Sequence, residues 1–216
     1  MKFRSGISVL ALLLAGAATP SFATTLSPGT QITPAVDNNA GGLILADTGQ
    51  IGFSFGGDTG TVEEFVGTNV DNPFAAGDIS FVYQITVTGG HIVNLTSENF
   101  NIPGIKLDVT QEDFALAGFP TPTTQAASAS LTGDGTTLGL GFTPPDGLTA
   151  GETSYLLIVN TNQTTWEDGL FSLQDGATGN FNGFVPQPTP EPGSLALLGT
   201  GLLGFAGVAR RKFLGK

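Results

Sequence analysis

The feature that most constrains this fold is a two-residue alternation of apolar and polar side chains, clearest in the stretch "DISFVYQITVT". One face of that stretch would carry Ile79, Phe81, Tyr83, Ile85 and Val87, and the other Ser80, Gln84, Thr86 and Thr88, with Val82 as the exception. A period of two is the period of a β-strand with one buried face. The stretches "IGFSFGG", "TTLGLGF" and "TSYLLIVNT" alternate in the same way, and no long amphipathic helix is visible. Strands at this spacing predict an all-β fold, an antiparallel β-sandwich of the jelly-roll or immunoglobulin-like type.

Glycine-containing turns separate the predicted strands. Gly133-Asp134-Gly135 lies between two of them. Gly89-Gly90 predicts a tight hairpin whose second strand, from His91 to Thr96, pairs back on the first. The 16 phenylalanines suit the space between two packed sheets. The chain has no cysteine, which excludes disulfides and thiolate chemistry.

Charge is distributed very unevenly along the chain, whose formal net charge is −11. Between the two ends of the chain, 17 acidic residues from Asp37 to Asp175 stand against one basic residue, Lys106, a net of 1 − 17 = −16. Such a body repels phosphates, so we expect no nucleic-acid partner. It should be soluble and should attract cations.

The N-terminal 23 residues have the three parts of a secretory signal peptide. Lys2 and Arg4 supply a positive start, and an apolar run follows from Ile7 to Ala18. Ser21 and Ala23 place small residues at a signal-peptidase site. We therefore expect export, a loose N-terminal segment over 24–42 and the acidic sandwich over 43–182. An uncleaved anchor is the weaker interpretation, because the apolar run is short.

The C-terminal region ends in an apolar segment followed by basic residues. Residues 193–209 contain no charged side chain, and as a helix at ~1.5 Å per residue they would be about 25 Å long, near the lower limit for crossing a bilayer. Arg210, Arg211 and Lys212 follow at once. Basic residues favour the cytoplasmic side, so we expect a transmembrane helix over 193–209 and a cytoplasmic tail over 210–216.

A proline-rich linker over 183–192 precedes that helix and ends in Pro190-Glu191-Pro192. Proline fixes φ, so this tripeptide should be stiff, extended and accessible to a protease. The ordered set of Pro-Glu-Pro, a short Gly/Leu-rich helix and an arginine-rich end resembles the PEP-CTERM sorting domain of Gram-negative bacteria. The resemblance implies recognition by an exosortase, cleavage near Pro190-Glu191-Pro192, and release of the body or its transfer to a surface acceptor. It also implies a link to exopolysaccharide and biofilm formation, and it does not cover the body.

Candidate ligand-binding residues in the body are few. Asp58 and Asp134 lie in acidic glycine loops that could hold a structural calcium ion, although turn chemistry alone explains both. Trp166 could stack on a sugar ring or belong to the core. His91 is the sole histidine, which excludes a multi-histidine site, and we interpret it as a hairpin residue.

The leading interpretation is an exported, surface-sorted and non-enzymatic protein that needs no cofactor. Its partners would be signal peptidase, exosortase, the membrane and a polysaccharide or other surface acceptor. Three alternatives remain open: a carbohydrate- or calcium-binding module, a permanently membrane-anchored ectodomain, and a secreted hydrolase. For a hydrolase, the adjacent pairs Glu63-Glu64 and Glu112-Asp113 would diverge on a strand, so catalytic carboxylates would have to come from distant positions.

Overall fold

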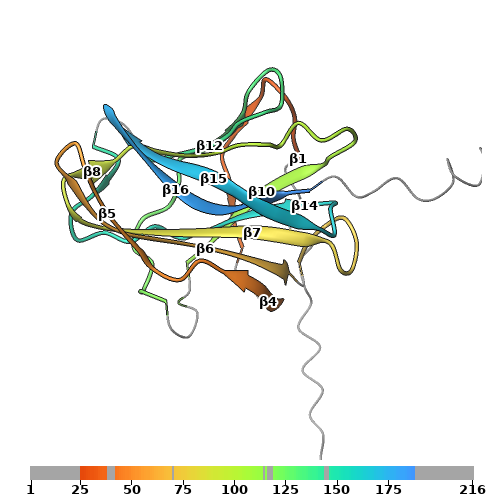
Figure 1. The fold of residues 1–216 in the computed structure, drawn as a ribbon, viewed down its shortest axis with the longest axis horizontal. Helices are drawn as coiled ribbons and strands as arrows, with labels where there is room; N and C mark the ends of the chain where they lie inside the picture. The colour runs from red at the N-terminus through yellow and green to blue at the C-terminus, as the bar shows by residue number, and fades with distance from the viewer. Residues whose placement is uncertain are drawn as a thin grey trace, which may run out of the picture.

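The structure is a computed structural model that describes residues 25–37, 42–69, 71–113, 115, 119–143 and 146–187. All regular secondary structure in these ranges is β-strand, arranged in two large sheets and one small one (Figure 1). This confirms the predicted all-β fold with antiparallel sheets.

The first sheet has the strand order β1-β10-β14-β7-β6-β4, with β3 beside β10 and β5 beside β6. Its strands are β1 (Thr25–Leu26), β3 (Ala35–Val36), β4 (Gly42–Asp47), β5 (Ile51–Phe55), β6 (Asp58–Asn69), β7 (Ile79–Gly89), β10 (Leu107–Glu112) and β14 (Leu156–Thr161). All pairs are antiparallel except β3 with β10.

The second sheet has the strand order β16-β15-β9-β12-β11-β2, and a separate pair joins β8 to β13. These strands are β2 (Gln31–Ile32), β8 (His91–Ile92), β9 (Asn94–Ser97), β11 (Ser128–Leu131), β12 (Leu138–Gly141), β13 (Leu148–Thr149), β15 (Trp166–Asp175) and β16 (Ala177–Pro186).

The two large sheets pack on each other through one core. The five apolar residues of β7 that alternate in the sequence are all at most 1% exposed. The Tyr83 ring on β7 meets the Phe171 ring of β15 edge-on, with 5.8 Å between centroids. The Tyr83 hydroxyl donates to Ser97 Oγ on β9 at 3.2 Å, which satisfies a polar group inside this core. Alternation thus identified correctly the face of β7 that is buried between the sheets.

The opposite face of β7 is also buried from Ser80 to Gln84, which alternation does not show. Val82 belongs to a second apolar cluster with Phe65, Leu156 and Ile158, against which Phe119 packs. Gln84 Nε2 donates to the Pro120 carbonyl at 3.0 Å. The connection around residues 119–124 therefore covers part of the outer face of the first sheet.

The predicted hairpin at Gly89-Gly90 is wrong. Near Gly89 one edge of β7 pairs with β6, and on the other edge Thr86 bridges to Thr153 and the Val87 N–H donates to the Glu152 carbonyl at 3.0 Å, so no further strand can pair there. The chain instead leaves the sheet: β8 pairs with β13, and β9 pairs with β12 and β15 of the second sheet. Gly90, at φ 71°, makes this corner, a conformation that glycine adopts without steric cost.

The ends of the body are more ordered than composition suggests. The predicted loose segment over 24–42 contributes β1, β2 and β3, which pair with both large sheets, and Leu26 is buried in the core. β16 continues to Pro186, through residues 183–186 of the predicted linker. Short pairings of this kind depend on distant strands and leave no periodic signal.

The predicted signal peptide (1–23), transmembrane helix (193–209) and cytoplasmic tail (210–216) lie outside the described residues. Within the part that the structure does describe, there is no helix of the length and apolar character needed to cross a membrane.

Candidate functional site

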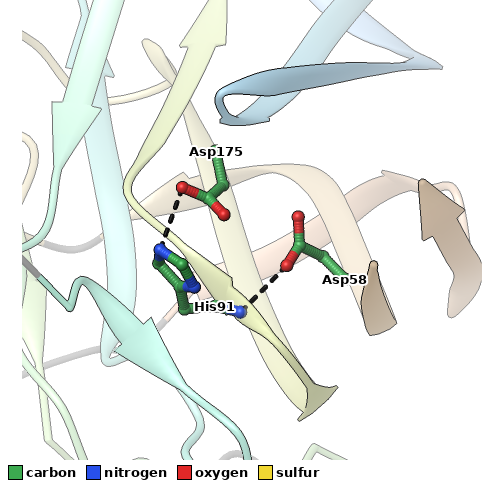
Figure 2. Close-up of polar contacts among 3 residues, drawn as sticks. All are labelled: Asp58, His91 and Asp175. Carbon is green, nitrogen blue, oxygen red and sulfur yellow. Dashed lines mark hydrogen bonds and ion pairs between the residues drawn. The ribbon is translucent and has the colours of Figure 1, made fainter. Parts of the chain in front are cut away.

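Three strand ends bring Asp58, His91 and Asp175 together at one end of the sandwich (Figure 2). Asp58 begins β6 after the β5–β6 turn, His91 begins β8 after β7, and Asp175 ends β15 before the turn into β16. Each lies next to a glycine with positive φ: Gly57, Gly90 and Gly176. Tight turns at these glycines place residues from distant parts of the sequence side by side.

The three side chains are linked by direct polar contacts. His91 Nε2 lies 3.0 Å from Asp175 Oδ1, and these side chains are 40% and 21% exposed. The backbone N–H of His91 donates to Asp58 Oδ1 at 3.0 Å. One ligand atom from each residue can be chosen so that all lie within 4.8 Å of one another. The cluster is thus open to solvent at His91 and closed at Asp58.

Asp58 is the buried member of the cluster, with 3% of its surface exposed. Its Oδ1 accepts the His91 N–H, but its Oδ2 is buried without a hydrogen-bond partner. Leaving a buried acceptor unsatisfied costs about 1–3 kcal/mol, and more for a charged group. This carboxylate is therefore incompletely satisfied by the protein around it.

Glycines allow the backbone to close around Asp58. A Cβ built on Gly56 would lie 2.7 Å from the Ala177 Cβ and 3.5 Å from Asp58 Oδ2. A Cβ built on Gly90 would overlap Asp58 Oδ1 and lie 2.9 Å from the Asp58 Cα. Side chains at either position would crowd the cluster or the turn beside it.

Asp134, the other calcium candidate, is an exposed turn residue. Its Oδ1 accepts from Thr132 Oγ1 at 2.6 Å, from Thr136 Oγ1 at 2.8 Å and from the Thr136 N–H at 3.1 Å. These hydrogen bonds lower the pKa of Asp134 to about 2, and the one from Thr132 has the largest effect. Among the described residues, Asp134 belongs to no group of three metal-ligating side chains. Turn chemistry accounts for its position.

Trp166, the candidate for sugar stacking, is the first residue of β15. It is partly buried and packs against the main core. The structure therefore places its indole at the margin of the interior.

Glu64 is a buried acid between the sheets, with 0% of its surface exposed. Its Oε2 accepts the Phe184 N–H of β16 at 2.9 Å, and its Oε1 has no hydrogen-bond partner. Burial raises the pKa of Glu64 to about 8, although the hydrogen bond from Phe184 lowers it in part. Burial, with Glu64 beside it, also raises the pKa of Tyr83 well above its usual value. Glu64 is therefore mostly protonated at neutral pH.

The neighbouring Glu63 is partly exposed and Glu64 is fully buried, so the two carboxylates do not form a catalytic pair. A hollow of about 630 Å³ lies beside β15 and β16. It is lined by Thr48, Ile51, Asp168, Gly169, Leu170, Asn182, Gly183 and Phe184. Asp168 is the one acid in that lining, whereas glycoside hydrolysis requires two facing carboxyl groups.

The remaining predicted site residues lie outside the described part of the chain: the signal-peptidase residues Ser21 and Ala23, the motif Pro190, Glu191 and Pro192, and the basic residues Arg210, Arg211 and Lys212. Sequence reasoning identified Asp58 but missed His91 and Asp175 as its neighbours. The available signal was a glycine beside each of the three residues, which indicates turns but not which turns meet.

Comparison with known families gave one match. Residues 188–212 match the PEP-CTERM protein-sorting motif, which confirms the resemblance seen in the sequence. The motif supports export, transient membrane anchoring and processing by an exosortase. No curated protein and no solved structure matched the chain.

Proposed function

We propose that this chain is an exported, non-enzymatic protein whose acidic β-sandwich is delivered to the cell surface or extracellular matrix of a Gram-negative bacterium. The observation that carries the proposal is the sorting motif at residues 188–212. In this proposal, signal peptidase cuts after Ala23, the segment 193–209 holds the body at the membrane, and exosortase cuts near Pro190-Glu191-Pro192.

The end of the fold supports such processing. β16 ends at Pro186, and the Gln187 N–H donates to the Thr165 carbonyl at 3.0 Å. The motif begins at the next residue, 188. Cleavage within the motif would therefore remove none of the strands that the structure describes.

The body suits a role in a polysaccharide-rich matrix. Its net charge of −16 favours solubility and discourages binding to anionic surfaces. The chain crosses repeatedly between two sheets, which supports a jelly-roll or immunoglobulin-like sandwich as the carrier. The link to exopolysaccharide and biofilm is implied by the PEP-CTERM resemblance.

The test is the mass of the protein recovered from its native host, with both terminal peptides mapped. We expect loss of residues 1–23 and of the chain after the Pro190 region, and any added mass would identify the acceptor. Glu191→Ala should block this processing, whereas Glu167→Ala, the same change on the exposed surface of β15, should not. A membrane-bound protein that still ends at Lys216 would overturn sorting and leave a permanently anchored ectodomain.

A further inference from the structure

We propose that Asp58, His91 and Asp175 bind a divalent transition-metal ion such as zinc. This inference concerns the folded body alone and does not depend on exosortase sorting. It replaces the calcium site considered for Asp58 with a different class of ion, because the structure adds an imidazole to the ligand set.

The donor atoms point to this class of ion. One imidazole nitrogen and two carboxylate oxygens are ligands that zinc and its neighbours in the first transition row accept. Calcium takes oxygen ligands, usually six to eight of them, and a histidine does not serve it. Three protein ligands would leave a fourth position for water or for an external ligand.

The second observation is the unsatisfied Asp58 carboxylate. Its Oδ2 is buried without a partner, and the cluster lies immediately beside it (Figure 2). The His91 N–H fixes the other oxygen, Oδ1, at 3.0 Å and so orients the carboxylate. Hydrogen bonds of this kind position metal ligands in known sites. A bound cation would supply the charge compensation that the protein itself does not provide.

The distances require only small movements. Zinc bonds of ~2.0–2.1 Å in a tetrahedron place two ligand atoms roughly 3.3 Å apart. His91 Nε2 and Asp175 Oδ1 are already 3.0 Å apart. The remaining separations are at most 4.8 Å. The less buried His91 and Asp175 side chains would close on the ion beside an Asp58 carboxylate that the His91 N–H holds in place. The ion would lie between His91 Nε2 and Asp175 Oδ1 in place of their direct contact.

The position of the cluster would make such an ion a structural clamp. Asp58 belongs to the first sheet, Asp175 to the second, and His91 to the two-stranded sheet of β8 and β13. An ion held by all three would join the two layers at the end where β5, β8 and the β15–β16 turn lie (Figure 1). Because the unfolded chain does not hold these residues together, the ion should stabilise the fold.

The experiment uses the full chain, purified in detergent with a tag that contains no histidine. Because His91 is the only histidine, ¹⁵N-histidine labelling gives the signals of one imidazole. We expect zinc chloride to shift the Nε2 resonance at saturation and to raise Tm. By calorimetry, His91→Gln and Asp175→Asn should weaken zinc binding at least about tenfold, since changes even beyond the direct ligands cost roughly 10–100-fold.

Asp134→Asn is the matched control, because it removes one carboxylate charge at an exposed turn and should leave zinc affinity unchanged. Far-UV circular dichroism of each variant establishes that it is folded before binding is compared. Unchanged imidazole signals at saturating zinc would overturn the proposal. The proposal would also be overturned if folded His91→Gln and Asp175→Asn bound zinc as tightly as the natural protein. Displacement of zinc by calcium at comparable concentrations would overturn it too.

Discussion

Glu64 is the residue whose chemistry the interior changes most. Its carboxyl releases a proton near pH 4.5 in the unfolded chain but near pH 8 in the folded protein. Between these values the native state binds more protons than the unfolded state, so stability falls as pH rises. The contribution of Glu64 is fully present below pH 4.5 and is lost through about pH 8.

We therefore expect Glu64→Gln, which stays neutral, to lessen the loss of stability between pH 5 and pH 8. One group contributes a slope of roughly 1.4 kcal/mol per pH unit over this window. The free energy of unfolding in urea at several pH values measures it, and the variant should exceed the natural protein at pH 8. Glu167→Gln, on the exposed surface, should keep the natural slope; equal slopes for both variants would show that Glu64 is not buried and protonated.

At the same scale, the sequence shows which residues could act but not which of them meet. Asp58 stood out because it is an acid in a glycine loop, and the structure places it in the cluster. Asp134 has the same local signal, and its turn hydrogen bonds account for it. His91 and Asp175 also lie beside glycines, which indicates a turn at each. The sequence does not show that these turns meet, because they converge only in the folded chain.

Among the elements, the approach of β16 to β6 depends on Gly183. A Cβ on Gly183 would overlap Glu64 Oε2 and lie 2.6 Å from the Phe171 ring. We expect Gly183→Ala to destabilise the protein by about 1–3 kcal/mol, the usual cost of overpacking. Gly52→Ala is the control, because nothing lies within 4 Å of the Cβ it would add and its φ is not positive. Urea unfolding should separate the two variants; equal stability would mean that β16 can move away from β6 at little cost.

β4 is the exposed edge of the first sheet. Leu43, Ile44 and Leu45 on this strand are 66%, 47% and 39% exposed. Edge strands with apolar side chains pair with other chains unless a charge prevents it. We expect Leu43→Lys to reduce aggregation on heating, as measured by light scattering, with little change in Tm. An unchanged scattering curve would show that association begins elsewhere on the molecule.

The elements also show where sequence reading succeeds. Alternation located β5, β7, β12 and β14, because each has an apolar face against the core. It failed at Gly89-Gly90, since a glycine pair indicates a turn but not whether the strand edge beyond it is free. The pairings of β1, β2 and β3 are too short to carry a period and depend on strands more than 70 residues away.

Over the whole molecule, the Asp58–His91–Asp175 cluster and the end of β16 lie at opposite ends of one hairpin. Asp175 and Ala177 pair at the turn between β15 and β16, whereas Trp166 and Pro186 pair at the other end. β16 has 10 residues, and at ~3.3 Å each it is about 33 Å long. The described chain therefore ends, at Gln187, far from Asp58, His91 and Asp175. A metal ion at the cluster would remain accessible while the other end is anchored or joined to an acceptor.

This arrangement predicts that the body is independent of the sorting motif. A chain that ends at Gln187 keeps every described strand and the bond from Gln187 to Thr165, so its Tm should stay within about 2 °C of that of the full chain. A chain that ends at Gly176 loses β16. It also loses the hydrogen bond that the Phe184 N–H donates to Glu64 and the Phe181 ring, whose centroid lies 5.4 Å from that of the stacked Phe171 ring. We expect it to lose its cooperative transition. Differential scanning calorimetry of the two chains measures both transitions. A large fall in Tm for the chain ending at Gln187 would mean that residues of the sorting motif help to stabilise the sandwich. Cleavage within the motif could then not release an intact body.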